Sequence, residues 1–147
     1  MRPIYMLNGP NLNRLGTREP EIYGSTTLAQ IEDGCRKAHP DTAIVFRQTN
    51  SETQLIEWVH EAIDHGSAII INPAAYTFTS LALLDALKMF KGPIVELHIS
   101  NVHQRESYYH KSYVSFAATA VMAGFGWRGY GLALGAVIDM LARDGAA

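Results

Sequence analysis

The sequence predicts an α/β fold in which parallel strands are joined by crossover helices. Short apolar runs bounded by turn residues alternate with segments of helical period, which is the pattern of a parallel sheet covered by helices. The 147 residues are 48% hydrophobic and 18% charged, a balance typical of a globular protein that buries one core. No linker, repeat or low-complexity segment divides them. We therefore expect one domain spanning residues 1–147.

Each short apolar run is expected to form one strand. In chain order the five runs are residues 4–7, 43–47, 68–71, 94–98 and a weaker one at 120–122. Two helices between them are marked by capping-box patterns at residues 27–30 and 51–54, where Thr or Ser is followed three residues later by Gln.

Two further helices follow from spacing and turn signals. One is expected over residues 81–90, because Lys91-Gly92-Pro93 stops it. The last has a buried stripe at Leu134, Val137, Ile138 and Leu141. Strands and helices in this alternation predict a doubly wound, five-stranded parallel sheet of flavodoxin-like topology, with a site outside the carboxyl ends of the strands.

Composition narrows the possible partners and compartments. The net charge of −2, with scattered basic residues, argues against a nucleic-acid partner. No stretch approaches the ~20 apolar residues of a membrane span, and the first apolar run is too short for a signal peptide. The single cysteine, Cys35, is expected to be a buried hydrophobe in a reducing compartment. We expect a cytoplasmic protein with a small-molecule substrate.

The common cofactor and nucleophile motifs give little support for a bound cofactor. The sequence contains no G-x-x-x-x-G-K-[ST], the phosphate-binding loop of nucleoside-triphosphate enzymes, and no G-x-S-x-G, the nucleophile motif of serine hydrolases. The spacing G-x-G-x-x-G occurs at Gly124–Gly129, but it follows the last expected strand and so lies outside a βαβ unit. His103 and His110 are too far apart for two metal ligands on one helix face, and no cysteine pair exists. We therefore expect neither a cofactor nor a metal.

A long polar loop, residues 8–24, follows the first strand and holds three Asn, three Gly and two Pro. Loops of this length in a compact domain are usually functional or disordered. This loop places Arg18 five residues before Tyr23. An arginine close to a tyrosine stabilises the phenolate, which is a strong base.

Other polar residues follow the ends of the remaining strands. Asn72 ends the third strand, and Glu96, His98 and Ser100 share one face of the fourth at strand spacing. A buried histidine is often only a core residue, but here a carboxylate can orient or charge it, which suits a proton donor. Asp85 falls on a helix, where the residue pattern alone favours a solvated side chain.

Four motifs resemble those of a known enzyme family. They are Asn8-Gly-Pro-Asn-Leu-Asn, Gly16-Thr-Arg-Glu-Pro-Glu-Ile-Tyr-Gly24, Asn72-Pro-Ala-Ala-Tyr-Thr, and Glu96-Leu-His-Ile-Ser-Asn-Val-His103 with Arg105-Glu106. In length, order and spacing they closely resemble the type II 3-dehydroquinate dehydratases over essentially the whole chain. The resemblance implies a cofactor-free trans dehydration of 3-dehydroquinate to 3-dehydroshikimate through an enolate, in the shikimate pathway or in quinate catabolism.

The same resemblance implies roles for individual residues. Tyr23 would remove a C2 proton, with Arg18 stabilising its phenolate. His98 would protonate the departing C1 hydroxyl, and Asn11 would hold a water that steadies the enolate. The residues expected to bind substrate are Asn72, Ile99, Ser100 and, from a neighbouring subunit, Asp85. Glu96 and Arg105 would support the site, and the chain would form trimers assembled into a dodecamer.

Two positions depart from the family pattern. Phe78 stands in Thr-Phe-Thr-Ser where the family has Thr-His-Thr-Ser, and Tyr109 stands in Tyr-Tyr-His-Lys-Ser where the family has Phe-Arg-His-His-Ser. In the family, that His and that Arg bind ring hydroxyls of the substrate. An alternative is therefore a diverged member that dehydrates another cyclic β-hydroxy ketone.

A non-enzymatic flavodoxin-like module is the competing class. A phospho-receiver needs acidic residues at the end of the first strand, and a flavin carrier needs a Ser/Thr-rich phosphate loop there. The sequence instead has Asn8-Gly-Pro-Asn11. A colourless protein with an acid–base pH profile of turnover would exclude this class.

Overall fold

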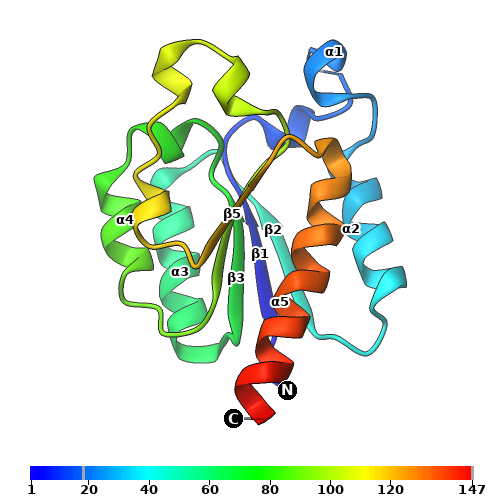
Figure 1. The fold of residues 1–147 in the computed structure, drawn as a ribbon, viewed down its shortest axis with the longest axis vertical. Coiled ribbons are helices and arrows are strands. Elements are labelled where there is room, and N and C mark those ends of the chain that lie inside the picture. The colour runs from blue at the N-terminus through cyan, green and yellow to red at the C-terminus, as the bar shows by residue number, and fades with distance from the viewer. Residues whose placement is uncertain (18, 147) are drawn as a thin grey trace.

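Five parallel strands form the central sheet of the computed structural model, in the order β2-β1-β3-β4-β5 (Figure 1). The strands are β1 Ile4–Asn8, β2 Ile44–Gln48, β3 Ala68–Asn72, β4 Ile94–His98 and β5 Ala120–Ala123. The structure describes residues 1–17 and 19–146, apart from the side chains of Ile22, Tyr23 and Ala146. This strand order is that of a flavodoxin-like sheet, so the predicted fold class is confirmed.

Five α-helices accompany the sheet within residues 1–17 and 19–146. They are α1 Pro20–Tyr23, α2 Leu28–Ala38, α3 Glu52–His65, α4 Leu81–Leu87 and α5 Gly129–Ala146. The capping box at the start of α2 is complete, because Thr27 and Gln30 each accept from the other's backbone N–H. At the start of α3, Ser51 accepts from the backbone of Gln54.

Helix α4 is shorter than the predicted 81–90. After Leu87 the α-helical hydrogen bonding gives way to a tighter turn, because the N–H groups of Met89 and Phe90 donate to the carbonyls three residues earlier. Such three-residue bonds close the last turn of a helix. The single turn α1, inside the polar loop 8–24, was not predicted from the sequence.

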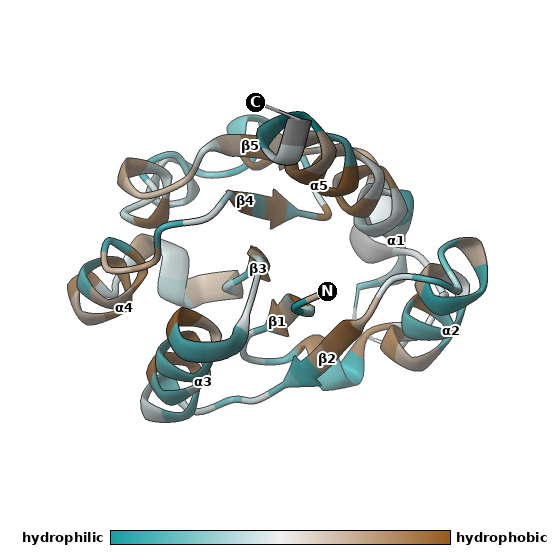
Figure 2. Cartoon of the chain, turned by 90° about the horizontal axis from the view of Figure 1, so that it is seen from below, coloured by the Kyte–Doolittle hydropathy of each residue, from teal (hydrophilic) through white to brown (hydrophobic). Residues whose placement is uncertain are grey.

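Residues alternate between two cores along β1. Ile4 and Met6 pack with α2 and α5, whereas Tyr5 and Leu7 pack with α3 and α4. Figure 2 shows the resulting layers, with α2 and α5 on one side of the sheet and α3 and α4 on the other. Among the described residues, no helix combines the length and the apolar character needed to cross a membrane.

The carboxyl ends of all five strands lie at the top of Figure 1, beneath α1 and the segment that follows β4. There the chain after β1 passes directly against the chain after β3. Gly9 N–H donates to the Asn72 carbonyl at 2.8 Å, and a Cβ on Gly9 would lie 2.4 Å from the Pro73 carbonyl oxygen. Only glycine permits this approach, which brings the two loops into one site.

Candidate active site

A pocket opens at the carboxyl ends of β1, β3 and β4, between the loops that follow these strands. Six of the residues to which the sequence assigned a role in the site line it: Asn11, Asn72, His98, Ile99, Ser100 and Arg105. Arg18 and the side chain of Tyr23 lie outside the described residues. Asp85 lies exposed on α4 and does not line the pocket of its own chain.

Glu96 and His98 form a buried pair behind the pocket. They are two residues apart on β4, so their side chains share one face, and they are 1% and 6% exposed. His98 Nε2 is hydrogen-bonded to Glu96 Oε2, and Ser115 donates from Oγ to Glu96 Oε1. The bond to Glu96 occupies Nε2, which leaves Nδ1 as the imidazole nitrogen that can exchange a proton with a ligand.

The carboxylate of Glu96 stays ionised in spite of its burial. Burial by itself raises the pKa of Glu96, but hydrogen bonds and charge from His98, with further hydrogen bonds from Ser115 and Ser112, lower it below its ordinary value. Ser112 is held in turn by Thr77, with 2.6 Å between the two hydroxyl oxygens. A fixed carboxylate of this kind stabilises a protonated imidazole and fixes the orientation of its ring.

Asn11 is held by residues at the end of β2 and just after it. It adopts a left-handed conformation with φ of 71°, which asparagine tolerates better than most residues. Its backbone N–H donates to Asn50 Oδ1 at 2.9 Å. Gln48 donates to the same oxygen and to the Gly9 carbonyl, each at 3.1 Å. The turn that presents Asn11 to the pocket is therefore tied to β2.

Phe78 and Tyr109 form one wall of the pocket. Their rings meet edge to face with centroids 5.3 Å apart, and Phe78 also stacks on His98. The guanidinium carbon of Arg105 lies 4.0 Å from the centroid of the Tyr109 ring, a cation–π contact. The two positions that depart from the family pattern therefore face the ligand space.

Several residues of the site carried no recognisable signal in the sequence. Gln48, Asn50 and Ser115 act only through contacts with residues distant along the chain. Tyr130, in the first turn of α5, reaches Asn72 from 58 residues away. Their hydrogen bonds are visible only once the strands are assembled.

No three His, Cys, Asp or Glu residues among those described are grouped so that they could hold a metal ion. The described polar groups that line the pocket are instead an imidazole, carboxamides, hydroxyls and a guanidinium. This combination can bind a polar small molecule and move a proton to or from it.

Fold and site together define an α/β protein of flavodoxin-like topology with an acid–base pocket at the carboxyl ends of its strands. Residues 2–138 match the family described as dehydroquinase class II. The chain belongs to this family.

Individual relatives agree with this assignment. The chain is 55% identical over 140 residues to a 3-dehydroquinate dehydratase of Acidovorax ebreus, covering 90% of this chain and 95% of the relative. It is 57% identical over 136 residues to a 3-dehydroquinate dehydratase of Streptomyces avermitilis, covering 90% and 85%. Its fold matches the crystal structure of a type II dehydroquinase from Propionibacterium acnes with a TM-score of 0.90 and 40% identity, over 95% of this chain and 97% of the other.

Proposed function

We propose that this chain is a hydro-lyase that converts 3-dehydroquinate to 3-dehydroshikimate and water, without a cofactor. The observation that carries the proposal is the buried His98–Glu96 pair, which opens onto the same pocket as Asn11, Asn72 and Ser100. The names of the relatives from Acidovorax ebreus and Streptomyces avermitilis support the same reaction.

The reaction is a trans elimination in two steps. The Tyr23 phenolate takes a proton from C2, and the electron pair of that C–H bond forms an enolate on the C3 carbonyl oxygen. The enolate then collapses, a double bond forms between C1 and C2, and the C1 hydroxyl leaves as water with a proton from His98. Asn11 holds the water molecule that steadies the enolate. Exchange with solvent returns both side chains to their starting states.

The base has to be activated by its surroundings. A tyrosine pKa of ~10 must fall by ~2 to 3 units to give substantial phenolate at neutral pH, which costs about 3 to 4 kcal/mol. A single close cation in a partly closed site supplies interaction energy of that order. Arg18 is the proposed cation.

Substrate recognition combines a carboxylate grip with a modified hydroxyl site. Ile99 and Ser100 would bind the carboxylate of the substrate. Asn72 would bind a ring hydroxyl or one edge of the same carboxylate. Phe78 and Tyr109 replace the family's hydroxyl donors, and each lost hydrogen bond to a desolvated hydroxyl costs ~1 to 3 kcal/mol. The alternative of a different cyclic β-hydroxy ketone has no support from the named relatives.

The proposal extends to the oligomeric state of the enzyme and to its compartment in the cell. We assign Asp85 to the pocket of a neighbouring copy, since it lies exposed on α4 away from its own pocket. This requires a homo-oligomer, proposed as trimers assembled into a dodecamer. We place the enzyme in the cytoplasm, in the shikimate pathway or in quinate breakdown.

A direct assay tests the function. Purified protein, dialysed against a chelator, is incubated with 3-dehydroquinate while the ultraviolet absorbance of the conjugated enone is followed. We expect turnover by the wild type and by His60→Gln, an exposed histidine on α3, and a loss of at least 100-fold in His98→Gln. A folded wild type that forms no enone would contradict the proposal, as would a yellow, flavin-containing protein.

A further inference from the structure

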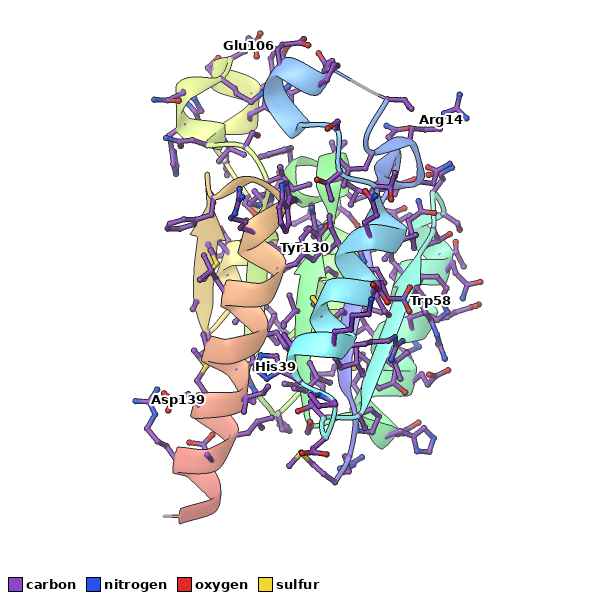
Figure 3. All side chains as sticks on the ribbon, turned by 90° about the vertical axis from the view of Figure 1, so that its right-hand side faces the viewer. Arg14, His39, Trp58, Glu106, Tyr130 and Asp139 are labelled. Atoms are coloured by element: carbon purple, nitrogen blue, oxygen red, sulfur yellow. The ribbon has the colours of Figure 1, made fainter. Side chains whose placement is uncertain are left out.

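The hydroxyl of Tyr130 lies between the side chains of Asn8 and Asn72. These two asparagines are register partners at the ends of β1 and β3. The hydroxyl donates to Asn8 Oδ1 at 2.7 Å and accepts from Asn72 Nδ2 at 3.0 Å. All three side chains are buried, at 1%, 0% and 4% exposed. Figure 3 shows Tyr130 in the upper part of α5, at the level of the strand ends.

The direction of each hydrogen bond in this group is fixed by its neighbours. Asn8 uses Nδ2 to donate to the Arg47 carbonyl at 3.1 Å, so its Oδ1 is the acceptor that takes the Tyr130 proton. The hydroxyl has only one proton, and it can therefore only accept from Asn72. Asn72 Oδ1 accepts from the backbone N–H of Ala74 at 3.2 Å.

The amide of Asn72 consequently has one orientation. Rotating it by 180° would place its oxygen against the Tyr130 lone pairs and its NH₂ against the Ala74 N–H, and both hydrogen bonds would be lost. One N–H of Asn72 is used by Tyr130, and Asn72 lines the pocket. Its second N–H remains as a donor for a ligand. The tyrosine also keeps its proton, because burial raises its pKa well above the ordinary value.

We propose that Tyr130 is a positioning residue that, together with Asn8, locks the Asn72 amide with its NH₂ group as the donor to substrate. This inference rests on the proposed function of the pocket, and it extends the site to a residue of α5 that does not touch the ligand. A buried polar network with every member satisfied is rigid and specifies a single arrangement. The lock prepares the donor before substrate arrives.

The test removes one oxygen atom. Tyr130→Phe keeps the ring and deletes the hydroxyl. Its matched control is Tyr5→Phe, because the Tyr5 ring is also buried (3% exposed) but packs on the opposite face of the sheet and its hydroxyl donates to Glu61 at 2.7 Å, away from the pocket. With 3-dehydroquinate, we expect KM to rise and kcat/KM to fall by about 10- to 100-fold in Tyr130→Phe, and to change less than twofold in Tyr5→Phe.

A double variant with Asn72 tests whether Tyr130 acts by positioning Asn72 or only by supporting the fold. Adding Tyr130→Phe to Asn72→Ala should cause no further loss in kcat/KM, since the lock has nothing left to hold. Losses that multiply in the double variant would overturn the proposal, and so would wild-type kinetics in Tyr130→Phe. If Tyr130→Phe does not fold, Asn8→Ala takes its place, because it frees the tyrosine proton to turn toward Asn72 and should likewise raise KM.

A measurement without substrate keeps this inference distinct from the proposed function. In ¹H–¹⁵N spectra of the unliganded protein, the side-chain amide signals of Asn72 should shift and exchange faster with solvent in Tyr130→Phe but not in Tyr5→Phe. Unchanged Asn72 signals would overturn the lock even in an active enzyme. A wild type without turnover, but with the expected change in these signals, would overturn only the proposed function.

Discussion

Phe78 stacks on the imidazole of His98, with ring centroids 6.1 Å apart and ring planes inclined by 21°. The imidazole thus contacts an apolar ring with its face and is hydrogen-bonded to the Glu96 carboxylate through Nε2. Beyond Phe78, the aromatic contacts continue through Tyr109 to Arg105. The proposed acid and a pocket cation are therefore joined by aromatic rings where the family pattern has a histidine and an arginine.

Restoring the family residues tests what this aromatic wall does. If 3-dehydroquinate is the substrate, Phe78→His with Tyr109→Arg should preserve or raise kcat/KM, because two donors return to the ring hydroxyls. The single variant Phe78→His is the control that leaves Arg105 on its aromatic partner. The measurement is kcat/KM for 3-dehydroquinate in the three proteins. A tenfold fall in the folded double variant would favour a less hydroxylated substrate.

Glu96→Gln removes the charge behind His98 with little change in size. The wild-type carboxylate is ionised at neutral pH, because the pKa of Glu96 lies below its ordinary value. Without that charge the imidazole loses the partner that orients it and balances positive charge on it, so kcat should fall about 100-fold at neutral pH. Ser115→Ala keeps the charge and removes one hydrogen bond. Its kcat should therefore stay close to that of the wild type, and an unchanged kcat in Glu96→Gln would contradict the assigned support.

The same carboxylate should affect stability in acid. A group whose pKa is lower in the folded state stabilises the fold above its ordinary value, here 4.5, and this contribution disappears as the pH falls through the folded pKa. Urea unfolding at pH 7, 4 and 3 should therefore show a smaller loss of stability in Glu96→Gln than in the wild type. Equal slopes against pH would show that the carboxylate is not held preferentially in its ionised form.

Tyr23→Phe should abolish turnover while leaving KM nearly unchanged, since a general base acts in the transition state more than in ground-state binding. The prediction rests on the spacing of Arg18 and Tyr23 in the sequence. Steady-state kinetics with 3-dehydroquinate check it, with Tyr5→Phe as the control that removes a hydroxyl far from the pocket. Retention of wild-type kcat by Tyr23→Phe would exclude Tyr23 as the base.

The sequence predicted the sheet well because its signals are local. Each of the five strands was found within one residue of its expected bounds, and the Thr27 capping box formed as its pattern indicated. Buried parallel strands are short apolar runs bounded by turn residues, and the rule that sites lie at their carboxyl ends brought Asn72, His98 and Ser100 together.

What the sequence could not predict depends on contacts between distant residues. Tyr130 is 122 residues from its partner Asn8, and it appears in the sequence only as one more apolar position of a helix. Asn50, just after β2, accepts a hydrogen bond from the backbone of Asn11, just after β1. Asp85 shows the opposite limit, because it lies exposed on α4 and does not line the pocket of its own chain. Its place in the site of a neighbouring copy therefore stays a prediction.

The backbones of Gly9 and Pro73 pass close to each other at the site. Gly9→Ala would place a methyl group 2.4 Å from the Pro73 carbonyl oxygen, so the loops after β1 and β3 must separate. We expect a loss of roughly 1 to 3 kcal/mol in the free energy of unfolding, as for other overpacked sites. We also expect a fall in kcat/KM, because Asn11 lies on one displaced loop and Asn72 directly precedes the other.

Gly34→Ala is the matched control. Gly34 lies exposed in the middle of α2, and a Cβ added there would meet no atom within 4 Å. It should raise stability by about 0.5 to 1 kcal/mol and leave kinetics unchanged. Urea unfolding and steady-state kinetics on both variants make the comparison. Equal stability of Gly9→Ala and the wild type would show that the loops are not held in contact as the structure has them.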